Sequence, residues 1–150
     1  MTTEERIEKL ERTIEEMQAV IRTKALCVLD DQGQVRINLA VDKAGAGLFL
    51  MDENGAPRVS IGVTNGGPGL SLHDANGTIR LGVGVRKDGP GLALSDSVGK
   101  IRAKLIMEKD GPALILNDEN GKNRIGLVVA NSGAILILLD ENGKRIWKAP

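Results

Sequence analysis

From Ala25 onward, apolar and polar residues alternate with a period of two, and Gly-rich segments interrupt the alternation at regular intervals. Short alternating runs between Asn-Gly or Asp-Gly dipeptides predict strands joined by tight turns, because Gly accepts the positive φ that such turns need. The segment from Leu48 to Gly69 is representative, with a short strand, a DENG turn at 52–55, a longer strand to Val63 and a second Gly-rich turn. This pattern predicts an antiparallel β-meander of about eleven strands.

The pattern recurs six times with a fixed period of 22 residues and no insertion or deletion. A fixed period predicts that each unit is a supersecondary element that buries its apolar side only by stacking on its copies. The units start at Leu26, Leu48, Leu70, Leu92, Leu114 and Leu136. The repeated polar and Gly positions, to which we assign a structural role, are Asp30, Asp52, Asp74, Asp96, Asp118 and Asp140; Gly33, Gly55, Gly77, Gly99, Gly121 and Gly143; and Arg36, Arg58, Arg80, Arg102 and Arg124.

The alternation predicts two different sheet faces. One carries aliphatic residues throughout, as at positions 35, 37, 39 and 41 of the first long strand and 79, 81, 83 and 85 of the third. The other carries the Arg column and small residues, and it becomes apolar towards residues such as Ile137 and Leu139. A sheet with one aliphatic face and no covering helix must close on itself or pair with other chains. We favour pairing between chains.

Residues 3–22 predict a helix, with Thr2 and Glu5 in the positions of a capping box. Its apolar residues are spaced three and four apart, and this narrow stripe is typical of a coiled coil. The alternative is an amphipathic helix packed on its own β domain. We therefore divide the chain into an oligomerising coiled coil at 1–24 and a β-repeat domain at 25–150. The heptad positions are Ile7, Leu10, Ile14, Met17 and Ile21.

Composition narrows the functional classes. Lys plus Arg and Asp plus Glu number 20 each, so net charge does not favour nucleic acid as a partner. One Phe, one Trp and no Tyr leave aliphatic residues to fill a narrow interior. A single cysteine, no signal peptide and no apolar run long enough for a membrane span favour a cytoplasmic protein, although a virion structural protein would have the same features.

The Asp column suggests two kinds of chemistry. The D-x-N-G segment matches part of a calcium loop, but the distal bidentate Glu of such a loop is missing. We expect instead that Asp caps the turn through its own backbone, that Gly takes the left-handed position and that Arg pairs with the Asp of a neighbouring unit. Calcium binding by the turns stays open, as does a glycan site lined by Asn and Arg.

The other chemically reactive residues give little indication of a site. His73 has no second His or Cys at metal-ligand spacing, and Cys27 occupies a packing position equivalent to Phe49. A Ser-His pair would have to use His73. The Gly-rich run at 66–69 leads into a strand rather than a helix, so it is a turn and not a phosphate loop. We predict no enzyme activity, no metal and no cofactor.

The unit L-x-L-x-D-x-x-G-x-x-R-x-x-L-x-V-x-x-x-G, placed after a short heptad helix and before the segment 147–150, resembles a group of uncharacterised bacterial repeat proteins. Members of that group often carry a membrane helix before the repeats, which this chain lacks. The resemblance implies a β-repeat fold and no particular activity.

These observations favour a non-enzymatic structural or assembly protein. We expect a homotrimer in which a coiled coil continues into a fibre-like β-prism stalk, because three flat faces enclose a narrow aliphatic interior. The heptad rule, with Ile at a and Leu at d, leans instead towards two chains. A dimeric sandwich and a β-solenoid of 22-residue coils are the architectural alternatives. The functional alternative is a binding module that holds a protein or glycan partner through its C-terminal repeats or its Arg-lined face.

Overall fold

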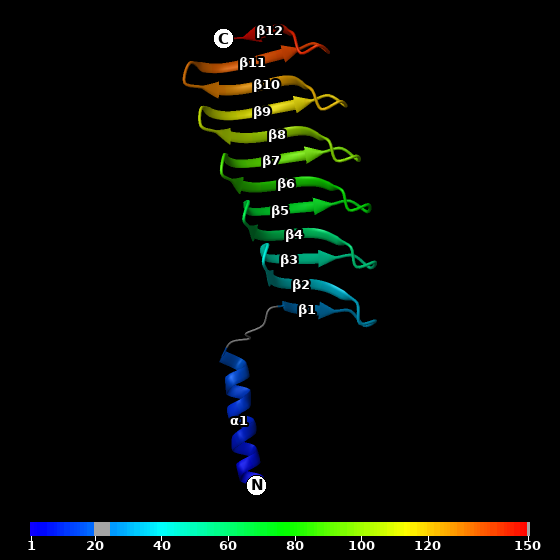
Figure 1. The fold of residues 1–150 in the computed structure, drawn as a ribbon, viewed down its shortest axis with the longest axis vertical. Coiled ribbons are helices and arrows are strands. Elements are labelled where there is room, and N and C mark those ends of the chain that lie inside the picture. The colour runs from blue at the N-terminus through cyan, green and yellow to red at the C-terminus, as the bar shows by residue number, and fades with distance from the viewer. Residues whose placement is uncertain (20–24, 150) are drawn as a thin grey trace.

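The computed structural model describes residues 1–19 and 25–149, and for residues 15–19 it describes the backbone alone. One helix precedes twelve strands (Figure 1). The helix is α1 (Thr3–Ala19), and the strands are β1 (Ala25–Leu29), β2 (Val35–Asp42), β3 (Gly45–Met51), β4 (Pro57–Thr64), β5 (Gly67–His73), β6 (Ile79–Arg86), β7 (Gly89–Ser95), β8 (Ile101–Glu108), β9 (Gly111–Asn117), β10 (Asn123–Ala130), β11 (Gly133–Leu139) and β12 (Arg145–Ala149).

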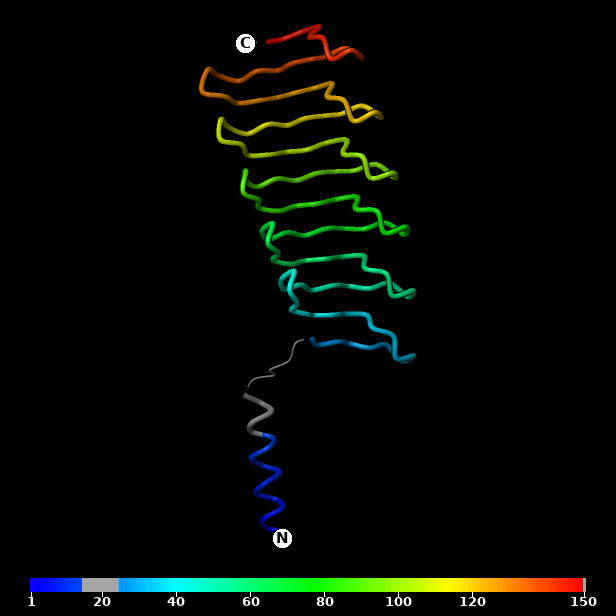
Figure 2. Tube along the Cα trace, in the orientation of Figure 1, coloured from blue at the N-terminus to red at the C-terminus, as the bar shows by residue number. Residues whose placement is uncertain are grey.

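All twelve strands form one antiparallel sheet in the order of the sequence. Each strand contacts only the strands before and after it, and the long turns lie along one edge with the shorter loops along the other (Figure 2). The predicted meander is therefore confirmed, with twelve strands rather than about eleven. The solenoid alternative is wrong, because a solenoid would place equivalent strands of successive coils side by side and parallel.

The strand register gathers the aliphatic residues on one side of the sheet. Leu48 of β3 lies opposite Leu39 of β2 and Ile61 of β4, and the same pairing recurs along the sheet. We call this side the aliphatic face. It contains Leu26, Val28, Ile37, Leu39, Val41, Ala46, Leu48, Leu50, Val59, Ile61, Val63, Pro68, Leu70, Leu72, Leu81, Val83, Val85, Pro90, Leu92, Leu94, Ala103, Leu105, Met107, Pro112, Leu114, Leu116, Ile125, Leu127, Val129, Ala134, Leu136, Leu138, Trp147 and Ala149.

A β-bulge follows every long turn. In the first hairpin Val28 pairs with Ile37 and Leu29 pairs with Val35, which leaves Arg36 as the extra residue. The bulge interrupts the alternation. Val35 therefore does not belong to the row that contains Ile37, and the sequence-based assignment of Val35 to that row is wrong. The same holds for residue 79 in β6. The extra residues of the six bulges are Arg36, Arg58, Arg80, Arg102, Arg124 and Ile146.

The second turn of the first five units is a two-residue loop that ends at a glycine. In the third unit Arg86 pairs with Gly89 across the loop Lys87-Asp88. Gly89 has a φ of 124°, and a methyl group on its Cα would overlap the main-chain carbonyl oxygen of Met107 in the next strand. Gly therefore satisfies two requirements here, a backbone conformation and a close approach between strands. The equivalent residues are Gly45, Gly67, Gly111 and Gly133.

The chain has almost no interior. It exposes 11375 Å², whereas a compact chain of this mass exposes about 7,400 Å². Ala113 is the one buried residue among those whose side chains are described, and Leu105 in the middle of the aliphatic face is 52% exposed. In the view of Figure 1 the axes of the strands stay nearly parallel along the sheet, while successive strands run in opposite directions. Flat sheets of many strands are usually stabilised by stacking against another layer.

Helix α1 begins where the sequence predicts. The Glu5 carboxylate accepts a hydrogen bond from the Thr2 main-chain N–H at 2.6 Å, and Thr2 Oγ1 accepts one from the Glu5 N–H at 3.2 Å, which forms the capping box. Residues 20–22, the predicted last part of the helix, lie outside the described residues. Within residues 1–19 and 25–149, α1 contacts no strand, and no helix has the length and apolarity needed to cross a membrane.

Candidate functional site

An aspartate closes each long turn. In the fifth unit Asp118 Oδ1 accepts hydrogen bonds from the main-chain N–H groups of Asn120 at 2.9 Å and Lys122 at 3.0 Å. The Gly121 N–H donates to the Asp118 carbonyl at 2.9 Å, and Gly121 has a φ of 80°. The carboxylate thus caps its own turn, and Gly takes the left-handed position. The same bonds form at Asp30, Asp52, Asp74, Asp96 and Asp140.

The second carboxylate oxygen pairs with the bulge arginine. Arg58 Nε lies 2.8 Å from Asp52 Oδ2, and Arg124 Nε lies 2.8 Å from Asp118 Oδ2. Both partners belong to one unit, so the expected pairing with the Asp of a neighbouring unit is wrong. The bulge explains the difference, because it places the extra residue beside the turn from which its own strand starts. The other pairs are Arg36–Asp30, Arg80–Asp74 and Arg102–Asp96, at 3.7, 3.3 and 3.5 Å.

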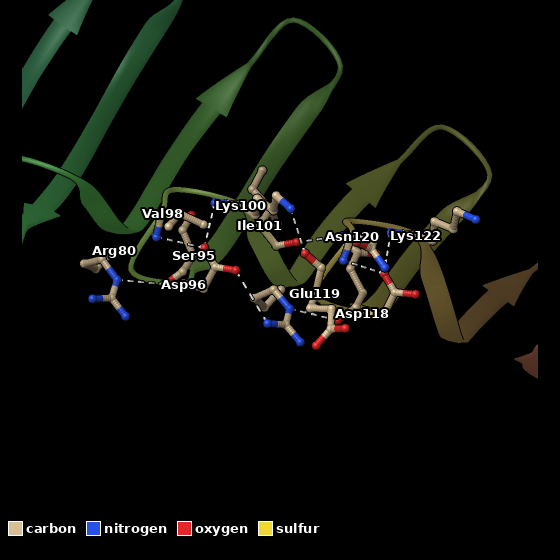
Figure 3. A network of polar contacts seen from close by, with 12 residues as sticks. Arg80, Ser95, Asp96, Val98, Lys100, Ile101, Asp118, Glu119, Asn120 and Lys122 are labelled. Atoms are coloured by element: carbon tan, nitrogen blue, oxygen red, sulfur yellow. Dashed lines mark hydrogen bonds and ion pairs between the residues drawn. The ribbon is translucent and has the colours of Figure 1, made fainter. Parts of the chain in front are cut away.

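Arg and Lys side chains near the long turns contact the next unit through its main-chain carbonyl groups. Arg80 Nε donates to the Ser95 carbonyl at 2.9 Å, and Lys100 Nζ donates to the Glu119 carbonyl at 2.9 Å (Figure 3). Arg102 and Lys122 repeat these contacts one unit further along. The sequence does not reveal the roles of Lys100 and Lys122, because every residue has a main-chain carbonyl and no particular residue type marks the acceptor.

The turns lower the pKa of their aspartates. For Asp52 the largest cause is the hydrogen bond from the Ala56 N–H, with Arg58 adding to it. For Asp74, Asp96 and Asp118 desolvation raises the pKa, but two main-chain N–H donors and the bulge arginine together outweigh it. All four carboxyl groups therefore have a pKa below the ordinary value of 3.8.

Because these pKa values are lower in the folded state, the protein should be least stable in acid. The aspartates contribute their full stabilisation above the unfolded-state pKa and lose it as pH falls through the folded-state pKa. We expect the midpoint of thermal unfolding to fall between about pH 5 and about pH 2. Asp96→Asn should lower the midpoint at neutral pH and flatten this dependence.

Asp88→Ser, which removes a carboxylate in a two-residue loop, is the matched control, and its midpoint should fall in acid as that of the native chain does. The measurement is thermal unfolding followed by circular dichroism across the pH range. A midpoint for Asp96→Asn that falls in acid as steeply as that of the native chain would contradict this account.

The geometry of the long turns leaves the aspartate oxygens poorly placed to bind Ca²⁺. Ca²⁺ needs several oxygen ligands around it, whereas each of these Oδ1 atoms faces two N–H donors and the Oδ2 atoms of five turns face an arginine. In the described part of the chain, no three His, Cys, Asp or Glu side chains group so as to hold a metal ion. The arrangement is built for turn capping.

An open groove of about 860 Å³ lies largely on the aliphatic face, and glycines of the adjacent row also line it. It runs across β2 to β9 on the side of the two-residue loops, between residues such as Leu48, Leu70 and Leu92. Every residue that lines it is apolar. Such a surface offers no hydrogen-bond partner to a polar ligand, so it suits only an apolar occupant.

The middle of the opposite face carries two rows of mostly small residues. One row changes from glycine to aliphatic residues at β8, and the other contains the polar residues Asn38, Ser60 and Ser71. The first row is Ala25, Ala40, Gly47, Gly62, Gly69, Gly84, Gly91, Ile106, Ala113, Val128 and Ile135; the second is Cys27, Asn38, Phe49, Ser60, Ser71, Gly82, Ala93, Lys104, Ile115, Gly126, Ile137 and Lys148.

His73 meets two serines on this opposite face. Its Nε2 lies 2.9 Å from Ser71 Oγ and 3.4 Å from Ser60 Oγ, and its Nδ1 lies 3.3 Å from the Gly77 carbonyl oxygen. A carbonyl acceptor favours the proton on Nδ1, which leaves Nε2 to accept from a hydroxyl. A Ser-His pair that catalyses acyl transfer needs free N–H donors to stabilise the oxyanion. The N–H groups of the strands around His73 bond across the sheet instead.

The heptad stripe of α1 is open to solvent in the single chain. Ile7, Leu10 and Ile14 are each about half exposed, at 50, 61 and 47%. Met17 lies in α1, although its side chain is outside the description, and Ile21 lies outside the described residues altogether. The structure therefore places two uncovered apolar surfaces in one chain, the α1 stripe and the aliphatic face.

Comparison with known proteins adds no relative. No protein-family model matches the chain, and no curated protein matches it either. The two uncovered surfaces are therefore the features of the molecule that point to a function.

Proposed function

We propose that the protein is a non-enzymatic structural protein whose chains associate into a homotrimeric stalk, with the aliphatic faces turned to a common axis. One observation carries the proposal: twelve strands present a continuous aliphatic face that nothing in the described chain covers. Burial of apolar surface contributes about 25 cal/mol per Å². Association between chains is therefore strongly favoured for this sheet.

The width of the aliphatic face supports three chains. Packed sheets lie about 10 Å apart, so each wall of a closed assembly lies about 5 Å from its centre. A three-sided prism with walls at about 5 Å has sides of about 17 Å, the length of about five extended residues. The aliphatic positions of β2 run from Ile37 to Val41, which is five residues.

The exposed stripe of α1 supports the same assembly. A helix of this length is marginal alone in water, so it gains stability by pairing with its copies. The stripe residues Ile7, Leu10 and Ile14 would form the seam, and Met17 and Ile21 extend it in the sequence. The coiled coil would hold the three chains in register at the β1 end of the sheet.

The mass of the protein in solution tests the proposal. By light scattering, the intact chain should have the mass of three chains; a monomer at micromolar concentration would refute the proposal, and a dimer would favour the sandwich. Removal of residues 1–24 should weaken association, because the sheets lose their coiled coil, while the β signal in circular dichroism stays. Loss of that signal would show that the sheet depends on the helix for folding.

A second function is favoured by the opposite face of the C-terminal strands. Its rows become aliphatic at Ile106, Ile115, Val128, Ile135 and Ile137, and in one row Lys104 and Lys148 flank this aliphatic part. In the proposed trimer this face is turned outwards. A protein or glycan partner could therefore bind there without disturbing the assembly, and the Arg-lined turns would border it.

A further inference from the structure

The chain contains five Asn-Gly dipeptides, and the structure places them in two different settings. Asn54-Gly55, Asn76-Gly77, Asn120-Gly121 and Asn142-Gly143 lie in the Asp-capped long turns. Asn65-Gly66 forms the two-residue loop between β4 and β5. An Asn-Gly bond can rearrange by itself when the glycine nitrogen reaches the asparagine side-chain carbonyl. The local hydrogen bonds decide whether it can.

The long turns hold their Asn-Gly bonds in place. The Gly N–H donates to the carbonyl of the capping aspartate, at 3.1 Å for Gly55 and 3.0 Å for Gly77. The Asn N–H of the same turn donates to the aspartate Oδ1, at 2.9 Å for Asn54. Rotating the Asn main chain into position for attack would break these bonds and move the glycine from its left-handed conformation. The four turns therefore oppose the reaction.

The two-residue loop restrains its Asn-Gly bond far less. The Gly66 N–H donates to the hydroxyl Oγ1 of Thr64 at 3.1 Å, and this hydroxyl donates to the Gly67 carbonyl at 3.4 Å, so a side chain rather than a main-chain carbonyl holds the N–H. Asn65 and Gly66 are exposed, as are the other four Asn-Gly pairs, so the acceptor of the glycine N–H, and not exposure, distinguishes this site. No aspartate side chain caps this loop, in contrast to Asp42 in the loop of the preceding unit.

We propose that Asn65 is the site of spontaneous deamidation in this protein and that the Asp-capped turns protect the other four asparagines. The Gly66 nitrogen forms a bond to Asn65 Cγ, and the bond from Cγ to the side-chain nitrogen breaks. Ammonia leaves with the proton of the Gly66 N–H. Water then adds to one of the two carbonyls of the cyclic imide and opens it to aspartate or isoaspartate.

The product changes one edge of the sheet. A new carboxylate appears between β4 and β5, on the edge that also carries Asp42, Asp88 and Asp110. Isoaspartate in addition inserts a methylene group into the main chain of a loop that sets the pairing of Thr64 with Gly67. Ageing of the protein would therefore act first on the β4–β5 hairpin.

Incubation of the intact protein in mildly alkaline buffer, followed by proteolysis and mass spectrometry, measures conversion at all five asparagines at once. We expect Asn65 to convert about tenfold faster than each of the other four, the factor supplied by about one additional hydrogen bond. In denaturant the five rates should converge, because every one of these asparagines precedes a glycine. Equal rates in the folded protein, or a difference that persists in denaturant, would overturn the proposal.

A turn variant provides a second readout with an internal control. Asp52→Ala removes the side-chain cap of one turn but keeps the main-chain carbonyl that accepts from the Gly55 N–H, so Asn54 should convert faster than in the unaltered protein, while Asn76 in the same molecule stays slow. A slow Asn54 in a variant whose Asn76 is also slow would overturn the protective role of the cap. A faster conversion at all five asparagines would show that the variant unfolds. The comparison of the conversion rates of the unaltered protein in buffer and in denaturant would then decide whether the proposal holds.

Discussion

Leu92→Asp is expected to separate the chains of the assembly, whereas Ala93→Asp, one residue further along β7, is expected to leave them together. Leu92 lies on the aliphatic face, paired with Val83 and Leu105. In a prism, the substitution brings three carboxylates towards the axis in an apolar interior. Burial of an unpaired charge costs about 3 kcal/mol or more per chain. Ala93 lies on the opposite face, where a carboxylate remains in water.

Light scattering and sedimentation at equal chain concentration give the measurement, since the stability of an oligomer depends on concentration. The Leu92→Asp chain should have the mass of a monomer or lose its β signal, and the Ala93→Asp chain should keep the mass of the unaltered protein. Retention of the native mass by both variants would show that the aliphatic face is not the interface. Dissociation of Ala93→Asp alone would place the interface on the opposite face.

Gly89→Ala is expected to destabilise the sheet much more than Gly133→Ala, although both glycines occupy the same position in their units. Their φ values are 124° and 118°, so both substitutions strain the main chain by about 1–3 kcal/mol. A methyl group at Gly89 would in addition overlap the Met107 carbonyl, whereas at Gly133 no atom of the described residues, apart from its two chain neighbours, lies within 4 Å of such a group. We expect a total loss of about 4 kcal/mol for Gly89→Ala.

Denaturant unfolding at one chain concentration compares the two variants. Both variants lose the stability that depends on the conformation of the turn. The difference between their free energies of unfolding therefore measures the cost of the overlap with the neighbouring strand. Equal losses would mean that the next strand moves aside at little cost, and the glycine would then serve the turn alone.

Much of the fold follows from the sequence because its signals are local. The alternation between Leu48 and Val63 identifies strands and the aliphatic face, and the D-x-N-G segments identify turns, since only glycine has positive φ in the described chain. The capping box at Thr2 and Glu5 is equally local. The twelfth strand was missed because residues 145–149 follow the last turn without a complete unit after them.

The bulges could not be predicted in the same way. Whether a bulge forms depends on how the long turn matches the hydrogen-bond spacing of the two strands that it joins. The alternation of residue types carries no information about that spacing. Arg36 therefore looked like an ordinary member of a polar face, and its ion pair was assigned to the wrong unit. The His73 contacts with Ser60 and Ser71 depend on the same register, and a sequence with one histidine gives no reason to expect them.

Because each strand contacts only its two neighbours, the length of the sheet is proportional to the number of units. Every unit adds two strands, or about 9.6 Å, and makes the same contacts as the unit before it. Loss or duplication of a whole unit joins equivalent residues, for example Gly69 to Leu92 in place of Leu70. The length of the sheet can therefore change in equal steps through the number of repeats while every turn, bulge and face stays in place.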